Sequence, residues 1–122
     1  DVAVKDTYMR RIHLADLFLD TPVYNGHTTT TDALWAGVPI LTLPFEKMAS
    51  RVAAGISAAL GCNEFIVSSE QEYEDRAVYL ASPQGRPHLQ ELRARLWSSR
   101  LTEPYFDTAR WVADVEVLYT QM

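Results

Sequence analysis

The sequence predicts an α/β fold, a partial Rossmann-like domain with about three parallel strands, flanking helices and a helical C-terminal tail. Two observations favour this class. A short apolar run, a glycine-bearing loop, a short helix and a second apolar run follow one another over residues 17–43, in the order of a ligand-binding βαβ unit. A hydrophobic content of 48% and a charged content of 22% are typical of a soluble globular chain. We therefore treat residues 1–122 as one domain.

The βαβ unit can be outlined from its stop signals. Residues 17–20 form the first expected strand, which Pro22 ends because proline has no amide proton to donate to a sheet. Gly26 permits a tight turn before a helix that opens with four threonines. Gly37 can end this helix in the left-handed conformation, and residues 38–43 form the second expected strand.

Apolar periodicity and turn signals predict six more elements. They are helices over 6–15, 46–60, 70–82, 88–100 and 107–121, and a third, edge-like strand over 64–67. Either Ser68 with Gln71 or Ser69 with Glu72 gives the third of these helices a capping box. The last helix carries apolar residues on more than one side, so we expect an isolated chain to form a homo-oligomer or to exchange helices.

The run of four threonines before Asp32 supports two interpretations. β-branched residues disfavour a helix start, but amides and hydroxyls at a helix N-terminus can hold a phosphate, and Asp32, one turn after Thr28, can accept bonds from ribose hydroxyls. Alternatively, Thr28 or Thr29 is an ordinary N-cap and Asp32 complements the helix dipole. His27 likewise either binds a ligand phosphate or satisfies a loop carbonyl.

Composition limits the classes of partner and the cellular compartment that we expect for this chain. A net charge of −5 argues against binding to nucleic acid, which requires a basic face. No apolar run approaches the ~18 residues of a membrane span, so no membrane partner is expected. The single cysteine, Cys62, excludes an internal disulfide and a cysteine metal cluster, and it favours a reducing, cytoplasmic location.

Several motifs at matched spacing carry a resemblance. They are Leu-Asp-Thr-Pro at 19–22, Asn-Gly-His-Thr-Thr at 25–29, Asp-Ala-Leu-Trp-Ala-Gly-Val-Pro at 32–39 and Ala-Ser-Arg at 49–51. Together they resemble the C-terminal part of the catalytic region of the protein O-GlcNAc transferase family. The likeness is continuous from about Val2 to Met122.

The resemblance implies the C-terminal half of a GT-B glycosyltransferase with two Rossmann-like domains. Such an enzyme inverts configuration as it moves N-acetylglucosamine from UDP-GlcNAc to Ser or Thr of proteins, with no metal or other cofactor. It also implies an N-terminal catalytic half and tetratricopeptide repeats upstream. Because the sequence begins in the middle of the pattern, we expect a fragment that is inactive alone.

The resemblance also assigns donor contacts. His27, Thr28 and Thr29 would meet the diphosphate, Lys5 and Asp32 the ribose, and Ala3, Tyr8 and Arg11 the uracil. Tyr8 stands where animal enzymes carry histidine, and Phe45 where glycine is expected, so the loop after residue 44 is expected to follow another path.

No catalytic residue is assigned, and His27 is the one candidate, because the family's leaving-group lysine lies upstream of this sequence. Two alternatives stay open: a GT-B enzyme for another nucleotide sugar or a non-protein acceptor, and a non-catalytic interaction module.

Overall fold

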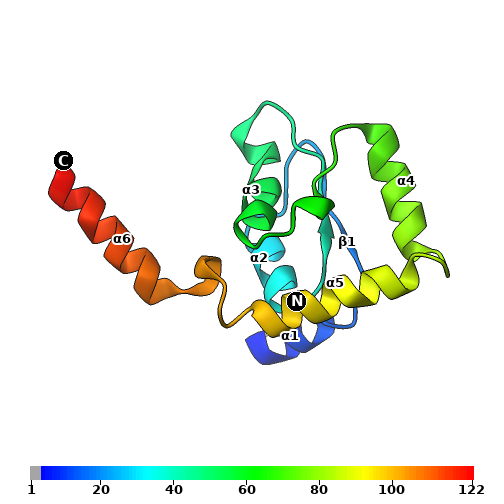
Figure 1. Cartoon of the computed structure of the whole chain (residues 1–122), viewed down its shortest axis with the longest axis horizontal. Helices are drawn as coiled ribbons and strands as arrows, with labels where there is room; N and C mark the ends of the chain where they lie inside the picture. Colours follow the sequence, from blue (N-terminus) through cyan, green and yellow to red (C-terminus); the bar gives the residue numbers. More distant parts are fainter. Residues whose placement is uncertain (1–3) are drawn as a thin grey trace.

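A computed structural model describes residues 4–122, which form six α-helices and a two-stranded parallel sheet (Figure 1). The elements in chain order are α1 (Lys5–Ile12), β1 (Phe18–Leu19), α2 (Thr28–Trp35), β2 (Ile40–Leu41), α3 (Val52–Ala59), α4 (Glu70–Ala81), α5 (Arg86–Ser99) and α6 (Thr108–Gln121). Short 3-10 turns occupy Met48–Ser50, Asn63–Phe65 and Pro104–Phe106.

The predicted βαβ unit is confirmed. β1 pairs with β2 in parallel, with Phe18 opposite Ile40 and Leu19 opposite Leu41, and α2 forms the crossover between them. Both strands are shorter than predicted. Gly37 follows α2 with a φ of 74°, the left-handed conformation expected of a glycine that ends a helix.

The predicted third strand over residues 64–67 is wrong. The amides of Phe65 and Ile66 bond back to the carbonyls of Cys62 and Asn63, at 3.2 and 3.0 Å, and so form a 3-10 turn. Only one parallel bridge, between Thr42 and Ile66, extends the sheet at this edge in the described part of the chain. Local turn bonds thus use the amides of Phe65 and Ile66, and only the Val67 amide donates across the sheet, to the Thr42 carbonyl at 3.0 Å.

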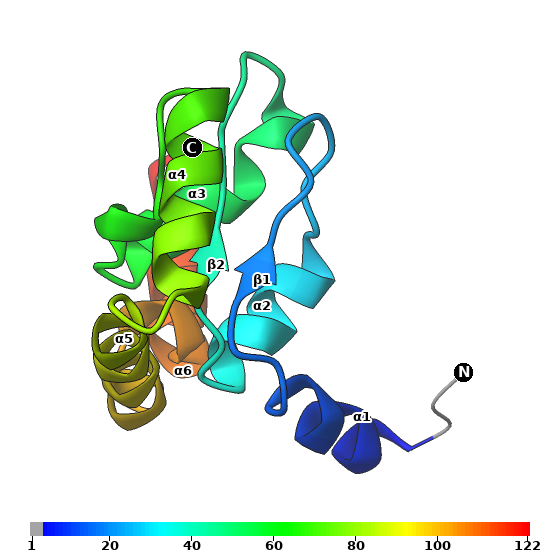
Figure 2. The same ribbon diagram turned by 90° about the vertical axis from the view of Figure 1, so that its right-hand side faces the viewer.

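The side chains of β2 divide the core in two. Ile40 points into the larger cluster, which collects side chains from α2, α3 and α5 around Phe65. Leu41 points the other way and packs with Leu43, Val67 and residues of α4. This alternation follows from the two-residue period of a strand. α2 and α4 accordingly lie on opposite sides of the strands (Figure 2).

The helix predicted over residues 46–60 is interrupted, and Asn25 explains why. In a continuous helix the amide of Ala53 would bond to the carbonyl of Ala49. Instead, the backbone amide of Asn25 donates to the Ala49 carbonyl at 2.8 Å, and the side-chain oxygen of Asn25 accepts from the backbone amide of Ala53 at 3.1 Å. A loop residue from 28 positions upstream has therefore replaced one turn of the helix.

The other helices match their predictions apart from their ends. α1 stops at Ile12, three residues early, and α5 begins at Arg86, two residues early. Of the two serines that could cap α4, Ser69 is the cap, because its hydroxyl accepts from the Glu72 amide at 3.1 Å. The Glu72 carboxylate turns back to Ser68, and bonds from the Ser68 amide and then its hydroxyl hold the pKa of Glu72 below its usual value.

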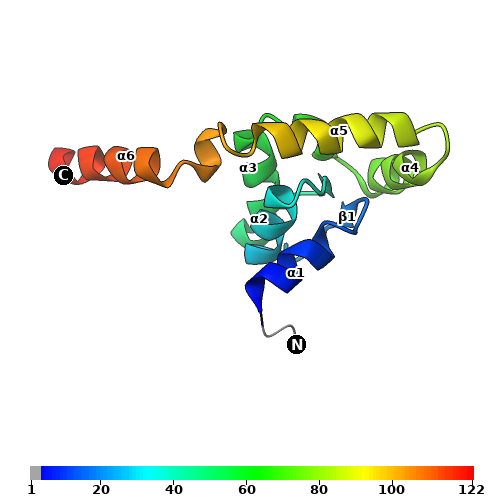
Figure 3. The same ribbon diagram turned by 90° about the horizontal axis from the view of Figure 1, so that it is seen from below.

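The helical tail extends away from the rest of the chain (Figures 1 and 3). Asp107 caps α6, and no residue of this helix is buried. Trp111, Leu118 and Met122 have exposed fractions of 63%, 60% and 99%, so these apolar side chains have little cover within residues 4–122. No helix in this described part of the chain is long and apolar enough to span a membrane.

Candidate functional site

A buried carboxylate anchors the loop that leads into α2. Asp20 is 2% exposed and accepts from the Gly26 amide at 3.0 Å and from the Thr42 hydroxyl at 2.8 Å. The Tyr73 hydroxyl donates to the Asp20 carbonyl at 2.8 Å. Asn25 fixes the same loop to the start of α3. These contacts give Asp20 a structural role at the end of β1.

We expect Tyr73→Phe to lower the free energy of unfolding by about 1 kcal/mol near neutral pH, because one partly buried hydrogen bond is lost. Burial raises the pKa of the Tyr73 phenol, and the charge of Asp20 raises it further. The unfolded chain therefore loses this proton first as pH rises, so the stability linked to Tyr73 declines above its ordinary pKa of 10.0. Urea unfolding at neutral and alkaline pH measures both effects.

Tyr119→Phe is the matched control, since Tyr119 is 71% exposed on α6. It should leave stability and its alkaline decline unchanged. Equal effects of the two replacements would contradict a specific role for Tyr73.

The N-terminus of α2 is open. His27 occupies the N-cap position, and no side chain caps the helix, so the interpretation of Thr28 or Thr29 as an ordinary N-cap is wrong. Both threonines are exposed. The first amides of any helix lack partners within it, and here they lie beside two exposed hydroxyls. This arrangement can receive an anion.

The other two threonines have structural contacts. The Thr30 hydroxyl is buried and donates to the Gly26 carbonyl. The hydroxyl of Thr31 lies 2.9 Å from that of Tyr105, which comes from the turn before α6. The four-threonine run therefore contains two residues that fix the helix start and two that face outward.

His27 is held by two contacts. Its ring stacks on that of Tyr24 with centroids 5.1 Å apart and an interplanar angle of 13°. Its Nε2 lies 3.4 Å from the carbonyl oxygen of Ala49. This contact fits the second interpretation of His27, in which the ring satisfies a loop carbonyl. Tyr24 is 65% exposed and was not among the residues predicted for the site. The sequence could have indicated Tyr24, because it is an aromatic residue three positions before a candidate histidine.

Lys5 and Asp32, the two residues predicted to contact the ribose, form an ion pair with each other. The Lys5 ammonium lies 2.7 Å from both carboxylate oxygens of Asp32 and 4.8 Å from the centre of the Tyr8 ring. The Asp32 side chain is only 15% exposed, whereas that of Lys5 is 64% exposed, so the lysine balances a largely covered negative charge. Asp32 follows Thr28 by four residues, about 6 Å along the helix axis. The Lys5–Asp32 pair thus lies next to the open helix start.

Two further residues, Arg11 and Ala3, were predicted to contact the uracil. Arg11 is exposed on α1, and no ion pair of this residue is present among residues 4–122. Ala3 lies outside the described residues. Within the described part of the chain no group of three or more His, Cys, Asp or Glu side chains could hold a metal ion.

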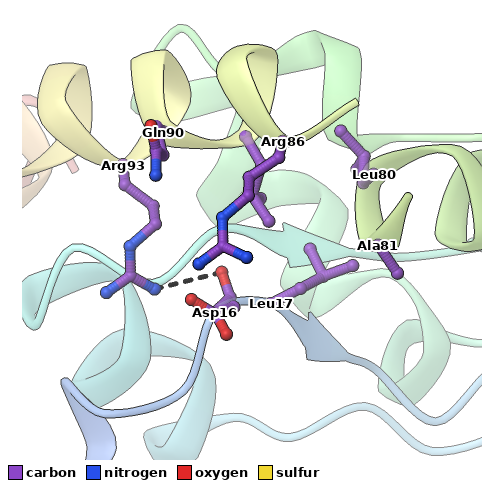
Figure 4. Close-up of a pocket in the computed structure, with 8 residues that line it drawn as sticks. Asp16, Leu17, Leu80, Ala81, Arg86, Gln90 and Arg93 are labelled. Carbon is purple, nitrogen blue, oxygen red and sulfur yellow. Dashed lines mark hydrogen bonds between the residues drawn. The ribbon is translucent and has the colours of Figure 1, made fainter. Parts of the chain in front are cut away.

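Two pockets of the molecule are lined by residues other than those predicted for the site. One of about 290 Å³ separates α1 from the ends of α2 and α5 and includes Met9, His13, Trp35 and Trp97. A second, of about 240 Å³, lies between β1, α4 and α5 (Figure 4). Neither pocket contains a predicted donor contact.

A family model described as glycosyl transferase family 41 matches residues 1–115 of this chain. The chain belongs to this family. The likeness to the O-GlcNAc transferase family is thereby confirmed, and it extends to named relatives and to a solved structure.

Two relatives of this family-41 chain cover its whole length. An Arabidopsis thaliana protein, named "Probable UDP-N-acetylglucosamine--peptide N-acetylglucosaminyltransferase SEC", is 54% identical over 123 residues, which are 12% of that protein. A Caenorhabditis elegans UDP-N-acetylglucosamine--peptide N-acetylglucosaminyltransferase is 43% identical over 122 residues, 10% of its length. The family-41 chain thus spans about a tenth of these relatives.

A mutant O-GlcNAc transferase from Thermobaculum terrenum has a similar structure. It superposes with a TM-score of 0.78 at 28% identity, over 98% of the family-41 chain and 22% of its own. This likeness supports a partial Rossmann-like domain, with two strands in the described residues rather than the three expected.

Proposed function

We propose that this chain binds the UDP part of UDP-GlcNAc, within an inverting glycosyltransferase that transfers N-acetylglucosamine to Ser or Thr of proteins. The observation that carries the proposal is the uncapped start of α2 beside the Lys5–Asp32 pair. His27, Thr28 and Thr29 receive the diphosphate, Lys5 and Asp32 the ribose, and Tyr8 stacks on the uracil, with Arg11 and the backbone of Ala3 at its edge. Residues 1–122 then form one nucleotide-sugar-binding subdomain.

Ribose binding requires the Lys5–Asp32 pair to adapt. Both side chains must exchange part of their mutual contact for bonds to sugar hydroxyls, which can accept from Lys5 and donate to Asp32. The Lys5 side chain is 64% exposed, so its ammonium can turn toward the sugar while it stays close to Asp32, whose side chain is only 15% exposed. The pair therefore orders the site without locking it.

We propose that the isolated chain is inactive. Inversion needs a base for the acceptor hydroxyl and a cation for the departing diphosphate. His27 supports the phosphate, and the remaining groups come from an upstream catalytic half, preceded by tetratricopeptide repeats. That half would also cover the apolar side chains of α6. Without it, we propose that the chain self-associates through α6.

The site is proposed to need no metal, because the helix start and Lys5 supply the positive charge. The intact enzyme is proposed to be cytoplasmic. A single cysteine, Cys62, is consistent with a reducing compartment. This residue is buried, and burial raises the pKa of its thiol, although Arg95 opposes this effect.

A UDP titration followed by NMR tests the proposal. We expect shifts at the amides of Thr28, Thr29 and Asp32, and a weakening of about tenfold for Asp32→Ala, because a hydrogen bond to a charged group is lost. Asp114→Ala removes the same charge from exposed α6 and should leave UDP affinity unchanged. EDTA should also have no effect.

The outcomes separate the alternatives. No shift up to millimolar UDP would favour a non-catalytic interaction module. Binding of other nucleoside diphosphates as tight as that of UDP would favour a related enzyme for another donor. A parallel loss of melting temperature and affinity in Asp32→Ala would mean that this residue is structural.

A further inference from the structure

α1 is weakly held by apolar packing. No residue of α1 is buried, and only Met9 and Ile12 pack partly against the core. Yet this helix carries Lys5, Tyr8 and Arg11, which are three of the proposed uridine contacts. The diphosphate contacts lie on another element, the start of α2. The geometry of the proposed site therefore depends on what keeps α1 in place.

Arg93 of α5 binds the chain just after α1. Its guanidinium donates to the carbonyls of His13 at 3.0 Å and Asp16 at 3.1 Å, and also to that of Ala15. Figure 4 shows the Arg93 side chain reaching across the edge of the pocket to Asp16. A separate contact, 2.8 Å between His13 Nδ1 and the Ala36 carbonyl, joins the same end of α1 to the end of α2.

These bonds satisfy carbonyls at and just after the end of α1. His13 is the C-cap of α1, where the negative end of the helix dipole favours a cation, and the carbonyls of Ala15 and Asp16 belong to the segment that follows. A guanidinium has five N–H donors in a planar fork and keeps its charge, so one side chain can bind three carbonyls. A lysine ammonium is a compact point charge and cannot span the same set.

We propose that Arg93 is a positioning residue for uridine recognition, which fixes α1 relative to the phosphate-binding start of α2. It touches none of the proposed donor contacts and acts through the backbone after α1. This inference rests on the proposed function, because it assumes that α1 binds the nucleoside.

The test compares Arg93→Ala and Arg93→Lys with Arg86→Ala in the full chain. Arg86 is an exposed arginine on the same helix and lines the same pocket, so its loss changes the charge equally. Hydrogen exchange measures the opening of α1, and NMR titrations with UDP and with inorganic pyrophosphate measure the two halves of the site.

We expect Arg93→Ala to speed amide exchange in α1 selectively and to weaken UDP binding about tenfold, from the loss of charge-assisted bonds. Pyrophosphate affinity should not change, Arg93→Lys should recover part of the UDP affinity, and Arg86→Ala should match the wild type.

Three results would overturn the inference. Unchanged α1 exchange in Arg93→Ala, with UDP binding intact, would reject the positioning role alone. An equal loss of UDP and pyrophosphate affinity would show a general structural effect. A wild-type chain that binds no UDP would overturn the proposed function first, and the uridine role with it.

Discussion

Replacing Gly85 with alanine is expected to lower the free energy of unfolding by about 3 kcal/mol, as severe overpacking does. Gly85 is buried where α4 passes into α5. A Cβ atom at this position would lie 2.0 Å from the carbonyl oxygen of Tyr79 and 2.7 Å from its carbon. Both neighbours are backbone atoms, so α4 and α5 must separate. The φ of −83° is ordinary, so the contact alone causes the loss.

Gly55→Ala is the control for this experiment. Gly55 lies inside α3, and a Cβ atom there would meet nothing within 4 Å. Alanine should therefore raise the free energy of unfolding by about 0.5–1 kcal/mol, because it restricts the unfolded chain and favours a helix. Chemical denaturation at one protein concentration compares the two variants. A Gly85→Ala chain as stable as the wild type would contradict this packing of the two helices.

Asp20→Ala is the second replacement with a large expected effect, a loss of about 3–5 kcal/mol in the free energy of unfolding. The change removes two hydrogen bonds to a charged acceptor and leaves the Gly26 amide and the Thr42 hydroxyl without their partner. Because Gly26 directly precedes His27, the loop into α2 should also loosen. UDP binding should then weaken even at temperatures where the variant remains folded.

Asp20→Asn provides the comparison. Its side-chain oxygen can still accept from Gly26, and the Thr42 hydroxyl can turn to accept from the new amide. We expect a loss of about 1 kcal/mol, with UDP binding retained. Thermal unfolding and the UDP titration together check both variants. If alanine and asparagine were equally tolerated, the buried carboxylate would not be the anchor of the loop.

The relatives are about ten times as long as this chain, so a further part of such a protein could cover the exposed helix α6. Its apolar side chains are exposed in the described chain, as are those of Trp35 and Trp97, which line the pocket of about 290 Å³ beside α1. Burial of such surface is the main favourable term in protein association. Addition of the proposed upstream half is therefore expected to protect α6 from proteolysis and to suppress self-association.

Much of the fold and part of the site followed from the sequence. The βαβ order, the left-handed Gly37, a serine cap at Ser68 or Ser69 and the extent of α6 were predicted correctly, and the structure chose Ser69. Each depends on residues within about one helical turn or one strand, where propensity, capping and periodicity act. For the same reason the motif at residues 25–29 indicated a helix start, whereas the choice between a capped start and one open to an anion was left to the structure.

The tertiary structure alone decided the features that rest on distant polar partners. Asn25 interrupts the helix before α3, Lys5 pairs with Asp32, and Arg93 ties α5 to the end of α1. The predicted third strand shrank to one bridge because a local turn satisfied the amides of Phe65 and Ile66. Such outcomes depend on which donors and acceptors the folded chain brings within about 3 Å, and neither spacing nor composition records that proximity.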